Sequence, residues 1–395
     1  MQEGPMIVRA SRHTIALIIA SGAAVAACGE EEAFEPQVAS NERLLAAAAT
    51  AQLGKDDQSI EQMTVVGDLD GDGIDDAVIR TSYAIDPAGE LQFGGDIYVI
   101  YGGSGLTGNI DLSNVPRLTG AYGFGVGITA TAVGDVDGDG LADLLVTASR
   151  SLRCADNIDG AGDDLRTGAY LMYGSPTRVA GAVPIGGVAT FLRDTHPCSI
   201  VSAVAGLGDL DGDGKADFAV ARLGIHTGEP TETLVFYGRG ARFPAVVELV
   251  ASADASITDG LPVTTVLSGI AKLGDVDGDG YDDFAVRDPI AFNTNVRLIR
   301  GGATRLAGNV AAAALSQTLF LGEDLCFHNE HFVAPLGDLD GDGADDFALV
   351  GCQGDDARVP QRSVDRVFYG RLGGFPAQVR FDESDATLAL AGAGA

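Results

Sequence analysis

One aspartate-rich loop recurs five times along this chain of 395 residues. The copies read DLDGDGIDD from Asp68, DVDGDGLAD from Asp135, DLDGDGKAD from Asp209, DVDGDGYDD from Asp275 and DLDGDGADD from Asp338. Every copy places aspartate at loop positions 1, 3, 5 and 9 and glycine at position 6. A hard divalent cation prefers carboxylate oxygens, and glycine lets the backbone wrap tightly around it. The sequence therefore predicts about five Ca²⁺ sites.

The alternative is a set of acidic turns without metal. It is disfavoured, because carboxylates held this close repel by about 3 kcal/mol per pair at an effective dielectric of about 20. The predicted carboxylate ligands are Asp68, Asp70, Asp72, Asp76, Asp135, Asp137, Asp139, Asp143, Asp209, Asp211, Asp213, Asp217, Asp275, Asp277, Asp279, Asp283, Asp338, Asp340, Asp342 and Asp346. We expect structural ions and not a calcium sensor, because no helix pair that could open flanks the loops.

The twelfth residue from each loop start separates these loops from EF-hands. An EF-hand needs a bidentate glutamate there. All five copies have an apolar residue instead: Ile79, Val146, Val220, Val286 and Leu349. The sequence therefore predicts a strand, and not a helix, directly after each loop.

The spacing of the loops predicts the architecture. Their first aspartates are separated by 67, 74, 66 and 63 residues, a period that suits a four-stranded propeller blade. We therefore expect an all-β protein, a β-propeller with five calcium-loop blades, and we expect residues 43–51 to lend a strand that closes the ring. An incomplete ring is the alternative.

Apolar runs surround each loop in a fixed order. The predicted first strands are Met63–Val66, Thr129–Val133, Val201–Leu207, Thr265–Leu273 and Phe332–Leu336. The predicted second strands are Ala77–Ile79, Leu144–Thr147, Phe218–Ala221, Phe284–Val286 and Phe347–Val350. The predicted third strands are Ile97–Tyr101, Ala169–Tyr173, Thr233–Tyr237, Val296–Ile299 and Arg366–Tyr369. More polar stretches should form outer strands: Asn109–Leu112, Ala245–Val250 and Ala377–Phe381.

At these loops and strands the chain resembles the FG-GAP/VCBS repeat family, which includes the integrin alpha-subunit propellers. The D-x-D-x-D-G-x-x-D loop, the apolar strand after it and the glycine-bounded third strand carry the resemblance, and Phe124-Gly125 matches the motif that names the family. The resemblance implies that the backbone carbonyl at loop position 7 completes each calcium site. Those residues are Ile74, Leu141, Lys215, Tyr281 and Ala344.

The first 42 residues read as an export and anchoring segment. Arg9 and Arg12 precede an apolar run from Ile15 to Ala27, which ends at Cys28 like the lipobox of bacterial lipoproteins. We expect residues 1–28 to be a signal peptide with Cys28 lipidated, residues 29–42 to be an acidic tether and residues 43–395 to form the propeller. The protein would then sit in the bacterial cell envelope, on the outer membrane or cell surface. An ordinary secretory signal is the alternative.

Charge and cysteine content add two expectations. A formal net charge of −31 argues against a nucleic-acid partner, which needs a basic surface. An even number of cysteines besides Cys28 in an exported chain suggests disulfides. Strand direction places Cys154, Cys198, Cys326 and Cys352 on the rim away from calcium, and predicts the pairs Cys326–Cys352 and Cys154–Cys198.

The function that the sequence favours is a lipid-anchored binding or adhesion module whose rim opposite calcium contacts a protein or glycan. The alternatives are a carbohydrate-active enzyme, since some polysaccharide lyases resemble this fold, and a lectin, which the absence of tryptophan disfavours. No catalytic residue is predicted, and we interpret His196, His328 and His331 as polar rim residues rather than a zinc or proton-transfer site. The rim contacts that we expect are Arg150, Arg153, Arg166, Tyr83, Phe93 and His226.

Overall fold

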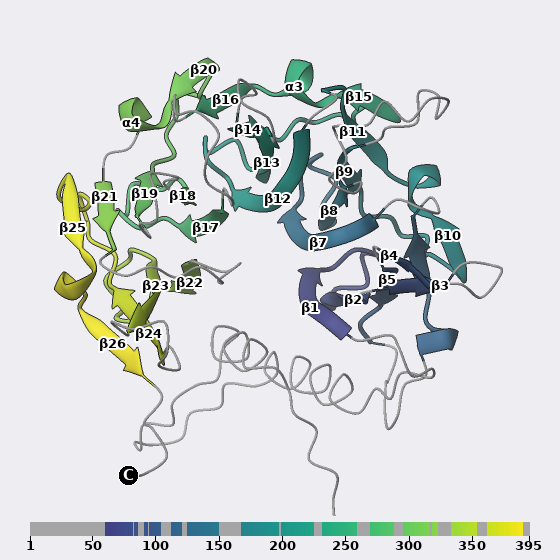
Figure 1. Ribbon diagram of the computed structural model, residues 1–395, viewed down its shortest axis with the longest axis horizontal. Coiled ribbons are helices and arrows are strands. Elements are labelled where there is room, and N and C mark those ends of the chain that lie inside the picture. Colours follow the sequence, from purple (N-terminus) through teal and green to yellow (C-terminus); the bar gives the residue numbers. More distant parts are fainter. Residues whose placement is uncertain are drawn as a thin grey trace, which may run out of the picture.

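The computed structural model shows five successive β-sheets arranged as blades around an arc (Figure 1). It describes residues 60–389 apart from 82, 86–90, 94, 104–111, 121–124, 150–166, 197–198, 225–230, 259–268, 288–294, 316–317, 323–332 and 354–361. Among these residues, strands dominate and the few helices span a single turn each. The prediction of an all-β propeller with five blades, each carrying one aspartate loop, is confirmed.

Each blade repeats the same antiparallel order of four strands. The first strands are β1 (Ile60–Gly67), β7 (Gly125–Gly134), β12 (Ser199–Gly208), β17 (Ile270–Gly274) and β22 (Val333–Gly337). The second strands are β2 (Asp76–Thr81), β8 (Asp143–Ser149), β13 (Asp217–Gly224), β18 (Asp283–Arg287) and β23 (Asp346–Gln353). The third strands are β5 (Ile97–Ile100), β9 (Thr167–Met172), β14 (Glu232–Phe236), β19 (Val296–Ile299) and β24 (Arg362–Phe368). The fourth strands are β6 (Arg117–Thr119), β11 (Thr190–Asp194), β16 (Ala255–Thr258), β21 (Thr318–Leu321) and β26 (Ala386–Ala389).

The outer strands were predicted wrongly. Two of the predicted stretches are strands, β15 (Val246–Glu248) and β25 (Gln378–Arg380), but they pair in parallel with the fourth strand of the preceding blade. β10 (Ala182–Pro184) and β20 (Gly308–Ala311) do the same on β6 and β16. We call these four segments strap strands. Each lies between the third and fourth strands of its own blade, so a pattern read within one repeat assigns it to the wrong sheet.

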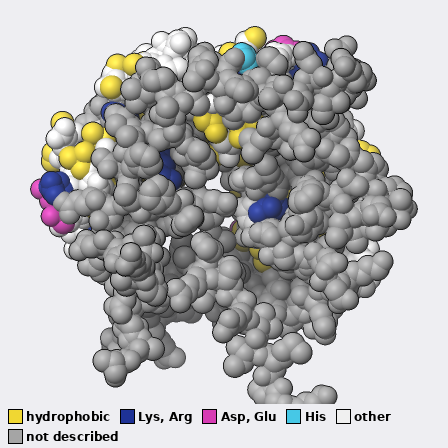
Figure 2. Space-filling view, in the orientation of Figure 1, with side chains coloured by type: hydrophobic (Ala, Val, Ile, Leu, Met, Phe, Trp, Pro, Cys, Tyr) yellow, Lys and Arg dark blue, Asp and Glu magenta, His cyan; other side chains and the backbone are white. Residues whose placement is uncertain are grey.

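Short elements connect the strands at the outer edge. They are the 3₁₀ turns η1 (Leu112–Asn114), η2 (Ile185–Gly187) and η3 (Phe381–Glu383), the one-turn helices α3 (Leu249–Ser252) and α4 (Ala312–Leu315), and the hairpin β3 (Tyr83–Ile85) with β4 (Leu91–Phe93). Figure 2 shows basic and acidic side chains together at the outer edge near β25. Arg380, the last residue of β25, donates to Asp382 of η3 at 3.2 Å. The predicted strand Asn109–Leu112 lies mainly outside the described residues, and Leu112 itself begins η1.

Apolar side chains from neighbouring blades form the core. The second strands bury both faces, as in β13, where all residues are buried, because a blade packs against another blade on each side. Phe218 and Phe236 stack within the third blade, with ring centroids 4.7 Å apart, and Leu145 and Leu171 of the second blade belong to the same cluster. A fully buried side chain of this size contributes roughly 1.5–3 kcal/mol. Packing between blades therefore carries much of the stability.

The blades follow one another in chain order around the arc. First strands β1, β7, β12, β17 and β22 pack in succession, whereas no contact of comparable extent joins β22 to β1 among the described residues. Figure 1 shows the corresponding opening between these two strands. Residues 43–51, which we expected to close the ring, lie outside the described part of the chain.

Candidate metal centres

Every aspartate loop joins the first strand of a blade to the second, and we number the loops 1 to 5 from Asp68, Asp135, Asp209, Asp275 and Asp338. In loop 1 the carboxylate of Asp68 accepts backbone N–H groups from Gly71 at 2.7 Å, Asp72 at 3.2 Å and Gly73 at 2.8 Å. Gly73 has φ of 82°, a conformation that favours glycine. Burial acts to raise the pKa of Asp68, but these N–H groups outweigh it and lower the pKa.

The aspartate at position 9 is fully buried and links its loop to the third strand. Asp76 accepts the N–H of Leu69 at 2.8 Å on Oδ2 and the N–H of Gly102 at 2.7 Å on Oδ1. Equivalent bonds hold the glycine that follows the third strand in every blade, and we call these residues the corner glycines: Gly102, Gly174, Gly238, Gly301 and Gly370. The glycine-bounded third strand noted in the sequence is therefore part of the loop's hydrogen-bond network.

Burial raises the pKa of the position-9 carboxyls. The value is about 6 for Asp76, about 7 for Asp143 and Asp217, and about 8 for Asp283. Backbone N–H donors oppose this shift, while the neighbouring aspartates add to it. A divalent cation would reverse the penalty, since it favours the ionised carboxylate.

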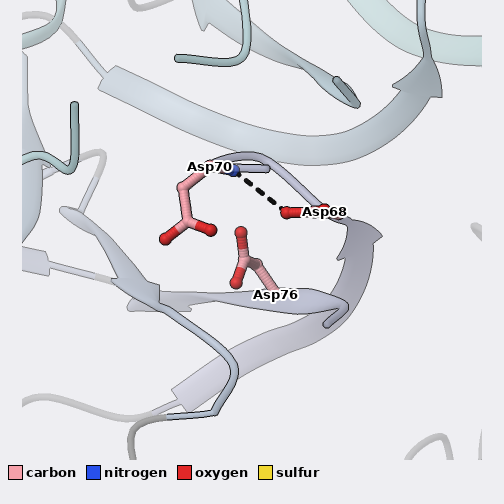
Figure 3. A group of neighbouring side chains, drawn as sticks. All are labelled: Asp68, Asp70 and Asp76. Carbon is pink, nitrogen blue, oxygen red and sulfur yellow. Dashed lines mark hydrogen bonds between the residues drawn. The ribbon is translucent and has the colours of Figure 1, made fainter. Parts of the chain in front are cut away.

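In each loop three carboxylates converge. One oxygen from each member lies within 4.8 Å of the others, and Figure 3 shows Asp68, Asp70 and Asp76 of loop 1 facing one another. The groups are Asp68, Asp70 and Asp76; Asp135, Asp137 and Asp143; Asp209, Asp211 and Asp217; Asp275, Asp277 and Asp279; and Asp338, Asp340 and Asp346. Oxygen-only donors of this density fit a hard divalent cation such as Ca²⁺.

The structure therefore brings positions 1, 3 and 9 together in four loops, and positions 1, 3 and 5 in loop 4. The position-5 carboxylate accepts the backbone N–H of position 7, as Asp72 does from Ile74 at 2.9 Å. Coordination by the position-5 carboxylate stays a prediction from the loop pattern, and coordination by the position-7 carbonyl stays a prediction from the family resemblance.

The loops also hold neighbouring blades together. The N–H at position 8 of one loop donates to the position-1 carbonyl of the preceding loop, as Ala142 does to Asp68 at 2.8 Å. The residue after a corner glycine donates to the position-2 carbonyl of the preceding loop, as Ser175 does to Leu69 at 2.8 Å. Both bonds recur at each of the four joints from the first blade to the fifth. Each loop is thus a component of the joint with the following blade.

Loop 5 has no following blade among the described residues, and its surroundings differ from those of loops 1 to 4. Its position-2 residue, Leu339, is 60% exposed, whereas the equivalents Leu69, Val136, Leu210 and Val276 are at most 2% exposed. A side chain from the next blade covers the position-4 glycine of loops 1 to 3, as Leu141 covers Gly71, but no described residue has an atom within 4 Å of where a Cβ would sit on Gly341. Loop 5 therefore presents an uncovered face.

Arginines are site residues that the sequence interpretation missed. Arg178, Arg242 and Arg305 each reach back to positions 3 and 5 of the preceding loop, and Arg300 reaches Asp277 of loop 4. The signal available in the sequence was an arginine four residues after a corner glycine in three of the repeats.

Most predicted rim residues lie outside the part that can be described. That applies to Arg150, Arg153, Arg166, His226, His328, His331, Cys154, Cys198 and Cys326, and the predicted lipidation residue Cys28 also lies outside it. Tyr83 and Phe93 stand opposite each other in the β3–β4 hairpin, and Cys352 lies in β23. The backbone N–H of His196 donates to Asp194 at 2.9 Å. The predicted disulfides and rim contacts stay predictions.

Comparison with known proteins agrees with the loop geometry. The FG-GAP repeat model matches residues 127–163, which contain loop 2. The chain thus carries an FG-GAP-type repeat within a five-bladed β-propeller. Integrin alpha-PS2 of Drosophila melanogaster is 28% identical over 241 residues, covering 58% of this chain and 15% of its own length. The matched region is therefore a small part of that relative.

No helix among the described residues is long and apolar enough to cross a membrane.

Proposed function

We propose that this FG-GAP-type propeller is a calcium-stabilised binding module of the cell envelope or cell surface. The integrin alpha relative supports a protein ligand, and a glycan is the other ligand class. The rigid blade framework would present a ligand-binding rim, and calcium would stabilise that framework without taking part in recognition.

The observation that carries this proposal is the integration of each metal loop into the fold. The position-9 aspartate is 0% exposed in every loop and binds the corner glycine of its own blade. Loops 1 to 4 also accept two backbone N–H groups from the following blade. Because these carboxylates and carbonyls hold the blades together, an ion bound to the loop would stabilise the fold.

We place ligand recognition on the rim opposite the aspartate loops, where the second strand of each blade connects to the third. These connections differ in length from blade to blade, from residues 225–231 in the third to residues 150–166 in the second. Variable loops on a rigid scaffold are the usual place for ligand contacts. Tyr83, Phe93, Arg150, Arg153, Arg166 and His226 are the residues that we propose for contact.

We further propose that Cys28 carries the membrane anchor, with residues 29–42 as a tether. More than one acyl chain is needed for stable anchoring, because one chain binds only marginally. Cys28→Ser should release the protein from the membrane fraction. An unmodified Cys28 in the mass spectrum of the mature protein would contradict the anchor while leaving the binding proposal intact.

The binding proposal is tested with the purified propeller on a panel of extracellular matrix proteins, envelope proteins and glycans, in millimolar calcium. Alanine substitutions at Tyr83 and Arg153 should weaken binding to the ligand found there while the melting temperature stays unchanged. Alanine at Asp76 should lower the melting temperature. Normal binding by the rim variants, with lost binding by a folded loop variant such as Asp342→Ala, would place recognition on the calcium face instead.

A further inference from the structure

Three arginines cross from one blade to the metal loop of the preceding blade. Arg178 of the second blade donates through Nε to Oδ2 of Asp70 and through Nη2 to Oδ2 of Asp72 at 2.8 Å. Arg242 binds Asp137 and Asp139 of loop 2 in the same manner, and Arg305 binds Asp211 and Asp213 of loop 3. Each guanidinium therefore spans the carboxylates at positions 3 and 5.

A tyrosine fixes the position of each of these arginines. The guanidinium carbon of Arg178 lies 4.9 Å from the ring centre of Tyr101, and the Tyr101 hydroxyl accepts the N–H of Val179 at 2.8 Å. Tyr173 with Arg242 and Tyr237 with Arg305 repeat both contacts. Cation–π stacking and the hydroxyl bond hold the arginine over the loop.

The arginine that contacts loop 4 comes from the fourth blade itself and not from the following blade. Arg300 stands where the other blades have this tyrosine, and its Nη1 lies 2.8 Å from Oδ2 of Asp277. Loops 1 to 3 each have an arginine four positions after the corner glycine of the following blade, but for loop 4 this residue is Gly374. A Cβ on Gly374 would lie 1.5 Å from Nη2 of Arg300. The two replacements therefore compensate each other, and loop 4 keeps one arginine.

We propose that Arg178, Arg242, Arg305 and Arg300 are positioning residues of metal loops 1 to 4. They would hold the position-3 carboxylate, and in three loops also that of position 5, in the orientation that a divalent cation needs. The inference rests on the proposed calcium sites. It adds that cation binding in loops 1 to 3 depends on a side chain delivered by the following blade.

The contacts favour positioning over competition with the ion. A competitor occupying the centre would touch all three converging carboxylates, whereas the hydrogen bonds of Arg178 go to Asp70 and Asp72, on the Oδ2 atoms. Asp68 and Asp76 keep their backbone partners. Partners that orient metal ligands from outside usually strengthen binding, and their loss typically weakens metal affinity by about 10- to 100-fold.

The experiment is calcium titration by calorimetry of the full chain with Arg178, Arg242 and Arg305 each replaced by Gln. Three of the five sites should weaken by about 10-fold or more. The matched control replaces Arg239 and Arg371 with Gln, because these arginines also stack on aromatic rings but pair with Asp254 and Asp385, away from the loops. The control should titrate like the wild type.

Two substitutions of Arg300 test the geometry of loop 4. Arg300→Gln should weaken one site, because it removes the guanidinium whose Nη1 lies 2.8 Å from Oδ2 of Asp277. Arg300→Lys keeps a cation at this position and should weaken the site less than Arg300→Gln does. Gly374 is kept as glycine in both variants, because its φ of 86° disfavours any side chain there.

Unchanged or tighter calcium binding in the glutamine variants would overturn the positioning role. Unchanged binding would show that the arginines do not affect the ion, and tighter binding would show that they compete with it. Equal calcium affinities of Arg300→Gln and the wild type at every site would overturn the role of Arg300 as well. A wild-type chain that binds no calcium would instead contradict the proposed function, so the two failures are distinguishable.

Discussion

The buried carboxylate of Asp346 accepts the N–H of Leu339 at 2.8 Å and the N–H of Gly370 at 2.7 Å, so one side chain joins the start of loop 5 to the end of the third strand. Both bonds go to backbone N–H groups of the chain itself. The position-9 aspartate therefore has a structural role in addition to its predicted role as a calcium ligand.

Substitution of Asp346 by Ala should destabilise the protein even in the presence of a chelator. It leaves two N–H groups without their partner, and each such group costs about 1–3 kcal/mol when it is buried. Asp342→Ala is the matched change in the same loop, because Asp342 is exposed and bonds only locally. In chelator, chemical denaturation should separate the two variants by about 2 kcal/mol or more, and equal stabilities would contradict the structural role.

Calcium should raise the stability of the wild-type chain. Each occupied site contributes about 1–2 kcal/mol by mass action at concentrations some tenfold or more above its dissociation constant. Differential scanning calorimetry should therefore show a higher melting temperature in millimolar calcium than in chelator. Magnesium at the same concentration is the control, and identical melting curves in calcium and chelator would contradict calcium as a staple.

The position-2 leucines should differ sharply in their sensitivity to substitution. Leu210 is 2% exposed and packs between the third and fourth blades, so Leu210→Ala should cost about 2–5 kcal/mol. Leu339 is 60% exposed, so Leu339→Ala should change the unfolding free energy by about 0.5 kcal/mol or less. Urea denaturation measures both, and a large effect of Leu339→Ala would show that this face is covered in solution.

The corner glycines should not tolerate a side chain. A Cβ on Gly174 would lie 2.5 Å from the Leu141 Cβ and 2.7 Å from the Ala142 carbonyl oxygen, so Gly174→Ala should destabilise by about 1–3 kcal/mol. Gly187, in the 3₁₀ turn η2, has open space around it. Gly187→Ala should therefore change the melting temperature little, and similar losses in both variants would contradict the close approach.

Local sequence was sufficient for the loops and for the three strands around them. The alternation of a first strand, an aspartate loop and a fully apolar second strand is contained within about 25 residues, so the pattern determines where Asp76 and Ile79 lie. Ile79 and its equivalents are buried, as their apolar character predicts.

What the sequence interpretation missed depends on contacts between repeats. The strap strands β10, β15, β20 and β25 join the sheet of the preceding blade, and Arg178 binds aspartates more than 100 residues earlier in the chain. Both features are invisible within one repeat, because their partners belong to another. The compensating pair of Arg300 and Gly374 shows the same dependence between blades.

The strap strands determine when each sheet can be completed during synthesis. The edge of β6 is completed by β10, which follows the third strand of the second blade, and the same holds for β11, β16 and β21 with their own straps. A blade emerging from the ribosome thus keeps an unpaired edge until much of its successor has been made. Nascent chains stalled before a strap would leave the edge of the preceding blade exposed to aggregation, whereas chains stalled after it would have that preceding sheet complete.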